Sequence, residues 1–114
     1  MSILREKSYP FALRIVKLTQ YLNEHHEYVL SKQILRSGTA VGALIKEAEF
    51  AQSRADFINK LSIALKEANE TEYWLNLLKD GGYISGSMFE SIRPEASELI
   101  KLLVSSIKTL KAQT

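Results

Sequence analysis

The chain has 114 residues, 46% hydrophobic and 25% charged, a composition typical of a globular protein with one buried core. Its 15 basic and 13 acidic residues give a net charge of +2, too small to identify a nucleic-acid-binding protein by charge alone. The lack of cysteine excludes disulfides, thiolate metal sites and cysteine nucleophiles. Without a signal peptide or an apolar run of about 18 residues, we expect a single cytoplasmic domain over residues 1–114 that does not enter a membrane.

Helical periodicity predicts a first helix over about residues 8–24 and a second over about 29–52. Ser8 is a suitable N-cap, and Pro10 is tolerated in a first turn because its missing amide proton would be unpaired there. The second helix contains Gly38 and Gly42, and interior glycine costs about 1 kcal/mol relative to alanine. Their spacing therefore indicates either a closely approaching neighbour or a locally weak helix. The apolar stripes are Phe11, Ile15, Leu18 and Leu22, then Ile34, Gly38, Val41, Ile45 and Ala48.

A third helix is predicted over about residues 53–80, with Ser53 as N-cap and Gly81 and Gly82 as its end. Its core face carries Phe57, Leu61, Ala64, Leu65, Ala68, Leu75 and Leu78. Roughly opposite lies a second apolar stripe of Ile63, Trp74 and Leu77, where a monomer would place polar residues. This stripe predicts an oligomer interface, and the alternative is an unusually wide core face.

The fourth helix is predicted over about residues 87–111, with Phe89, Ile92, Ala96, Leu99, Leu103, Ile107 and Leu110 along one stripe. Pro94 interrupts this pattern, so the helix either kinks there or begins there after a short separate turn. The connections between all four helices are short, which favours antiparallel neighbours. The predicted fold is therefore all-α, an antiparallel up-and-down four-helix bundle.

The stretch from Gln33 to Leu78, QILRSGTAVGALIKEAEFAQSRADFINKLSIALKEANETEYWLNLL, resembles the signature region of a bacterial four-helix-bundle family. Members of this family include proteins encoded in intervening sequences of large-subunit ribosomal RNA genes. The accessory protein of diversity-generating retroelements is similar too. The resemblance implies a four-helix bundle that assembles into a homopentameric ring, with a basic surface that engages nucleic acid in the accessory protein. Leu44 stands where the family usually has asparagine, so a polar contact resting on that asparagine cannot form here.

No combination of residues points to catalysis, so we expect no enzyme, no cofactor, no metal site and no small-molecule substrate. The two histidines, His25 and His26, have no glutamate three residues before them, which excludes the Glu-x-x-His pattern of di-iron bundles. Glu67 and Glu70 lie one turn apart and are interpreted as an ion-paired or solvated face rather than an acid–base pair. Glu72 projects near the core stripe, so burial would require an arginine or lysine partner from another helix.

Four basic residues are candidates for contacting a phosphate backbone. Arg14 and Lys17 share one side of the first helix, and Lys32 and Arg36 lie one turn apart on the second. A single copy would bind weakly, but copies repeated around a ring would act together. The sequence thus favours a non-enzymatic homo-oligomer that binds RNA or DNA through repeated basic patches. The alternative is a protein–protein interaction scaffold without a nucleic-acid role.

Overall fold

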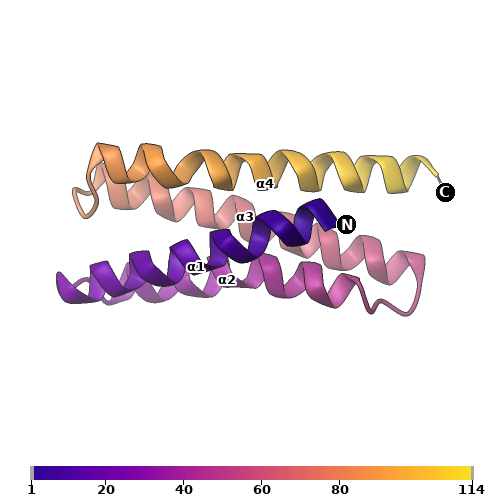
Figure 1. The fold of residues 1–114 in the computed structure, drawn as a ribbon, viewed down its shortest axis with the longest axis horizontal. Helices are drawn as coiled ribbons and strands as arrows, with labels where there is room; N and C mark the ends of the chain where they lie inside the picture. The colour runs from indigo at the N-terminus through magenta and orange to yellow at the C-terminus, as the bar shows by residue number, and fades with distance from the viewer. Residues whose placement is uncertain (1, 114) are drawn as a thin grey trace.

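The computed structural model describes residues 2–113 as a bundle of four long α-helices measuring 47 × 21 × 20 Å. The helices are α1 (Ser2–Glu24), α2 (Val29–Ala48), α3 (Arg54–Asp80) and α4 (Gly86–Ala112). The four helices run along the long axis of the molecule (Figure 1). Each consecutive pair packs together and α1 also contacts α4, so the bundle is closed. This arrangement confirms the antiparallel up-and-down bundle.

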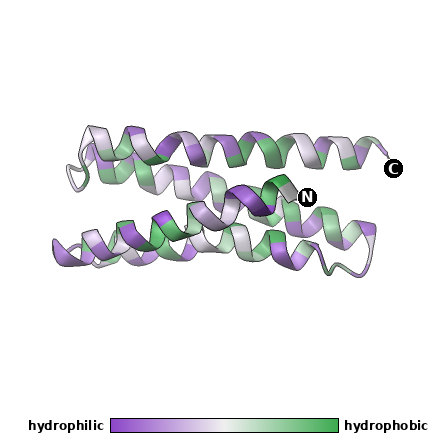
Figure 2. Ribbon diagram, viewed as in Figure 1, coloured by the Kyte–Doolittle hydropathy of each residue, from purple (hydrophilic) through white to green (hydrophobic). Residues whose placement is uncertain are grey.

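The core contains most of the side chains that the periodic stripes predicted, while Phe57, Leu65 and Leu110 are only partly buried against it. Hydrophobic and hydrophilic residues alternate along every helix at helical spacing (Figure 2). In α1, Phe11, Ile15 and Leu22 are almost completely buried, and Leu61, Leu75 and Leu78 are buried in α3. Each such side chain contributes about 1.5–3 kcal/mol relative to exposure, so these stripes supply most of the driving force for folding.

Helix α1 begins at Ser2, so the predicted start near Ser8 was wrong. Ser8 is buried inside the helix, and its hydroxyl approaches the carbonyl oxygen of Arg5 at 3.5 Å instead of capping the end. Pro10 removes the backbone bond to the carbonyl of Glu6. Both residues are exposed, so water can satisfy that carbonyl and the helix continues.

The boundaries of α3 follow the predicted signals closely. The Ser53 hydroxyl accepts a hydrogen bond from the amide of Asp56 at 3.0 Å. At the other end Gly82 adopts a positive φ of 82°, and the next amide, that of Tyr83, donates to the Leu78 carbonyl at 2.8 Å. Helix α2 ends at Ala48, short of the predicted Gln52, because residues 49–53 form the turn that leads to α3.

Pro94 lies inside a continuous α4, which excludes the predicted alternative of a short separate turn before it. The helix starts at Gly86, one residue before the predicted position, and the Ser85 hydroxyl accepts from the Met88 amide at 3.1 Å. Pro94 and Glu90, whose carbonyl loses its partner, are both exposed to water.

The glycines of α2 lie where α1 packs closely against this helix. A Cβ placed on Gly38 would lie 2.8 Å from two side-chain carbons of Ile15 in α1, and one on Gly42 would lie 3.4 Å from the Ser8 hydroxyl. This contact confirms the predicted close neighbour. Over the part of the chain described, none of the four helices has the length and apolarity needed to cross a membrane.

Candidate functional site

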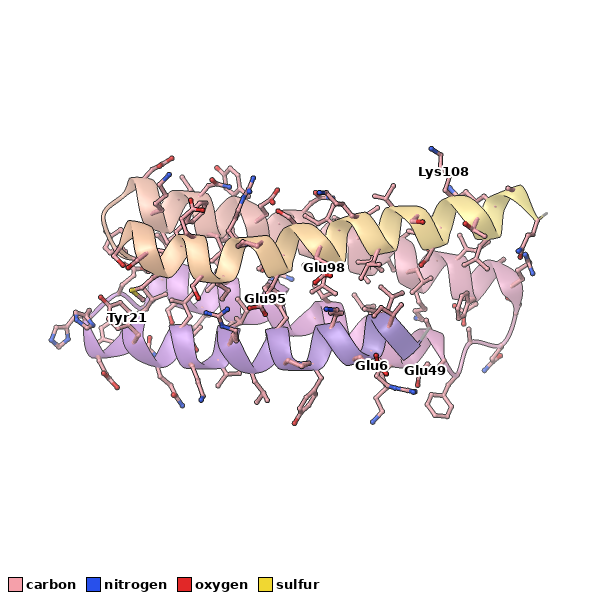
Figure 3. All side chains as sticks on the ribbon, turned by 45° about the horizontal axis from the view of Figure 1, so that its top comes forward. Glu6, Tyr21, Glu49, Glu95, Glu98 and Lys108 are labelled. Carbon is pink, nitrogen blue, oxygen red and sulfur yellow. The ribbon has the colours of Figure 1, made fainter. Side chains whose placement is uncertain are left out.

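Arg14 and Lys17, the two candidate basic residues of α1, lie on the side of this helix that faces α4. Arg14 forms an ion pair with Glu95, and it also donates to the Ser91 carbonyl at 2.9 Å and to the Ser91 hydroxyl at 2.7 Å. Glu95 and Glu98 project from α4 on the side where α1 runs (Figure 3), and Glu98 pairs with Lys7 at 3.4 Å. Arg14 therefore links two helices of its own chain.

The α2 arginine is engaged in the same way, but with α3. Arg36 donates to Glu67 at 3.1 Å and forms an ion pair with Glu70. The hydrogen bond from Arg36 lowers the pKa of Glu70 below its ordinary value, and the same bond raises the pKa of Arg36. Glu67 and Glu70 are thus ion-paired carboxylates, one of the two arrangements that the sequence left open, and their partner is Arg36 of α2.

The four predicted basic residues do not form one patch on a single copy. Since α1 contacts α2 and α4 while α3 contacts α2 and α4, the seam between α1 and α4 lies opposite the seam between α2 and α3. Arg14 lies on the first seam and Arg36 on the second. Lys17 and Lys32 are exposed and make no ion pair with residues 2–113. Of the four predicted basic residues, these two lysines therefore remain available to a phosphate.

The apolar stripe of α3 is only partly open to solvent. Ile63 and Trp74 are half-buried, and Leu77 is 38% exposed. Glu67 and Glu70 lie between Ile63 and Trp74 on the same face, so the ion pairs with Arg36 interrupt the stripe. The indole N–H of Trp74 is buried and finds no hydrogen-bond acceptor among residues 2–113.

Two hollows beside α1 escaped the sequence-based prediction. A cavity of about 500 Å³ lies between α1 and α2, lined by small residues such as Ala12, Gly42 and Ala43 and bordered by Tyr9, which is 67% exposed. A second cavity of about 440 Å³ lies between α1 and α4 and contains Arg14 and Lys17 in its wall. The spacing of small residues on α2 was visible in the sequence, but the helix that would face them was not.

Glu72 links α3 to α4. Glu72 accepts from the Ser97 hydroxyl at 2.9 Å and lies 4.0 Å from the guanidinium of Arg93, so α4 supplies the partner expected for it. Leu44, where the family usually has asparagine, is partly buried against the core. Within residues 2–113 no group of histidine, aspartate and glutamate side chains is arranged to hold a metal ion.

Residues 2–105 match the model of the 23S rRNA-intervening sequence protein family. The chain belongs to this family. Its structure is similar to the crystal structure of a protein of unknown function from the S23 ribosomal protein family of Bacteroides thetaiotaomicron, with a TM-score of 0.90 and 62% sequence identity. The alignment covers 92% of this chain and 98% of that chain. Among curated proteins, none matches the chain.

Proposed function

We propose that this intervening-sequence family protein is a non-enzymatic helical bundle that associates with copies of itself and presents a repeated surface to a partner. The supporting observation is the mostly apolar groove between α1 and α2. Tyr9 and Leu13, one turn apart on α1, are 67% and 48% exposed, and Tyr9 lines the groove. Contiguous apolar surface rimmed by charged groups is typical of protein–protein contacts. A homopentameric ring is the assembly that the family resemblance implies.

The stripe on α3 is the second contact surface of this proposal. Leu77 is the member most open to solvent, whereas Trp74 packs against the core. A charge at Trp74 would weaken folding as well as assembly, so Leu77→Glu tests this surface more cleanly.

Light scattering after size-exclusion chromatography tests self-association. We expect the wild-type protein at high micromolar concentration to have several times the mass of one chain. Tyr9→Glu should shift it toward the monomer, and Leu77→Glu should do so if the α3 stripe contributes. Val104→Glu is the control, because Val104 is 45% exposed on α4, away from both surfaces. A monomeric wild-type protein would contradict the proposal.

Nucleic-acid binding is a second candidate function, favoured by Lys17 and Lys32. Both lysines are exposed without an ion pair among the described residues, and a ring would repeat them in every subunit. Each phosphate that a lysine neutralises adds affinity that falls as salt rises. Multivalent display would raise the avidity beyond that of one copy.

Fluorescence anisotropy with labelled structured RNA and duplex DNA, from low to physiological salt, tests this candidate. The Lys17→Glu, Lys32→Glu double variant should abolish salt-sensitive binding. Reversing Arg14 or Arg36 would break ion pairs inside the bundle, so those variants would confuse binding with folding. Absence of binding by the wild-type protein at low salt would leave the protein–protein scaffold as the function.

A further inference from the structure

The cavity between α1 and α4 has the features of a small-molecule site. Its volume of about 440 Å³ lies within the range of about 300–1,000 Å³ typical of ligand pockets. One wall is a stripe of α1, and the other is the first two turns of α4. The lining residues are Arg14, Lys17, Leu18, Tyr21, Ser87, Met88, Ser91 and Ile92.

The two ion pairs that join α1 to α4 along this seam end at the cavity. Lys7 pairs with Glu98 and Arg14 pairs with Glu95, each joining α1 to α4. Lys17 is the next cation along α1, yet the α4 residues that share the cavity with it carry hydroxyl and apolar groups and no carboxylate. The residues one turn away on α1 are Leu13, Arg14, Gln20 and Tyr21, so no acid lies one turn from Lys17 on its own helix. Within residues 2–113 the Lys17 ammonium group therefore has no carboxylate partner.

Several donors surround the place where such an anion would lie. The Ser91 hydroxyl accepts a hydrogen bond from Arg14, so its own proton is free to be donated to a ligand. Ser87 lies in the first turn of α4, where the helix dipole favours negative charge. Its hydroxyl shares a hydrogen bond of 3.1 Å with the Ser85 hydroxyl, which also caps the Met88 amide, so the amides of Gly86 and Ser87 are the ones left to an anion. An ammonium, two hydroxyls and a helix N-terminus suit the several oxygens of a phosphate better than the two of a carboxylate.

The remainder of the cavity is apolar and partly aromatic. Leu18 and Ile92 form the buried floor, and Met88 and Tyr21 flank the opening as half-buried side chains. Tyr21 is held by His25, whose ring centroid lies 4.1 Å from its own. Figure 3 shows Tyr21 near the end of the bundle where α4 begins. A flat organic group could stack against this ring, as bases do on aromatic side chains.

We propose that the α1–α4 cavity binds a nucleoside monophosphate, with the phosphate on Lys17, Ser87 and Ser91 and the base beside Tyr21 and Met88. The cavity has room for about one nucleotide, which is either free or the phosphorylated 5′ end of a strand. This inference does not rest on self-association. It concerns a pocket for one nucleotide rather than a surface for a phosphate backbone.

Isothermal titration calorimetry with AMP, adenosine and inorganic phosphate tests the site. We expect AMP to bind more tightly than either fragment. Lys17→Gln should weaken AMP binding about tenfold or more, since a charged hydrogen bond is lost. Lys108→Gln is the matched control, because it removes an exposed lysine at the end of the bundle far from Tyr21 (Figure 3). Tyr21→Leu should weaken AMP but leave inorganic phosphate unchanged.

Amide chemical shifts in an NMR titration with AMP should change around Lys17, Tyr21 and residues 87–92 and remain unchanged near Lys108. The proposal is overturned if AMP fails to bind at millimolar concentration, if adenosine binds as tightly as AMP, or if the two lysine variants weaken binding equally. A 5′-phosphorylated oligonucleotide that outcompetes both AMP and its 5′-hydroxyl counterpart identifies a strand end as the ligand. Weaker competition than AMP identifies the free nucleotide.

Discussion

Helix α1 meets its two neighbours in different ways. Against α2 it approaches so closely that Ile15 fills the space where a Gly38 side chain would begin. Against α4 it is held by the long side chains of Arg14 and Lys7, and a cavity of about 440 Å³ remains between the helices. Small residues set the distance on one side and ion pairs set it on the other. The α1–α2 seam is thus tightly packed at Gly38 and hollow beside Tyr9, where about 500 Å³ remains, whereas ion pairs bridge the α1–α4 seam next to its pocket.

Shortening one side chain at each of the two seams should give the largest difference in the free energy of unfolding. Ile15→Ala removes a fully buried side chain from the tight seam and should lower the free energy of unfolding by about 2–5 kcal/mol. Met88→Ala should cost less, because Met88 is only partly buried beside an existing cavity. Urea denaturation of both variants measures this difference. Equal losses would mean that the two seams are packed equally well.

Substitutions at the two α2 glycines test the same comparison and should change the free energy of unfolding by less than Ile15→Ala does. Gly38→Ala places a methyl group 2.8 Å from Ile15 and should destabilise by about 1–3 kcal/mol, reduced by the roughly 1 kcal/mol gained in helix propensity. Gly42→Ala is the matched control, since its nearest neighbour is the Ser8 hydroxyl at 3.4 Å, and it should be neutral or stabilising.

A double-mutant cycle tests the cause of the Gly38 effect. In an Ile15→Ala background the added methyl group has room, so Gly38→Ala should cost less than it does alone. Additive losses would show that Ile15 is not what restricts position 38.

The smallest expected effect lies on the α2–α3 seam and depends on pH. Arg36 lowers the pKa of Glu70 below its ordinary value of 4.5. A carboxyl group with a lowered pKa stabilises the folded state above its unfolded pKa, and that contribution is lost as the pH falls through the folded pKa. Between about pH 7 and about pH 3, the wild-type protein should therefore lose more stability than Glu70→Gln.

Denaturant unfolding at both pH values checks this expectation. Glu90→Gln, at an exposed position of α4, should lose as much stability as the wild type. If Glu70→Gln also matched the wild type, the Arg36 contact would contribute nothing in solution.

Core positions and most helix ends could be read from the sequence because their causes are local. The Ser53 cap, the Gly82 turn and the apolar stripes each depend on neighbours within a few residues. The start of α1 was missed for the opposite reason. Ser8 and Pro10 are good start signals, but Leu4 is buried in the core and extends the helix beyond them.

The candidate sites show where that local reasoning ends. Periodicity places Arg14 and Arg36 on a side of their own helices, but it does not say which neighbour each side will face. Rotation and packing of the helices decided that one arginine reaches Glu95 and the other reaches Glu67 and Glu70. The sequence by itself determined four amphipathic helices and their antiparallel order, because turns and stripes are properties of short segments. Only the tertiary structure decided which charges are neutralised, where two helices pack tightly and where pockets remain, because these depend on contacts between residues far apart in the chain.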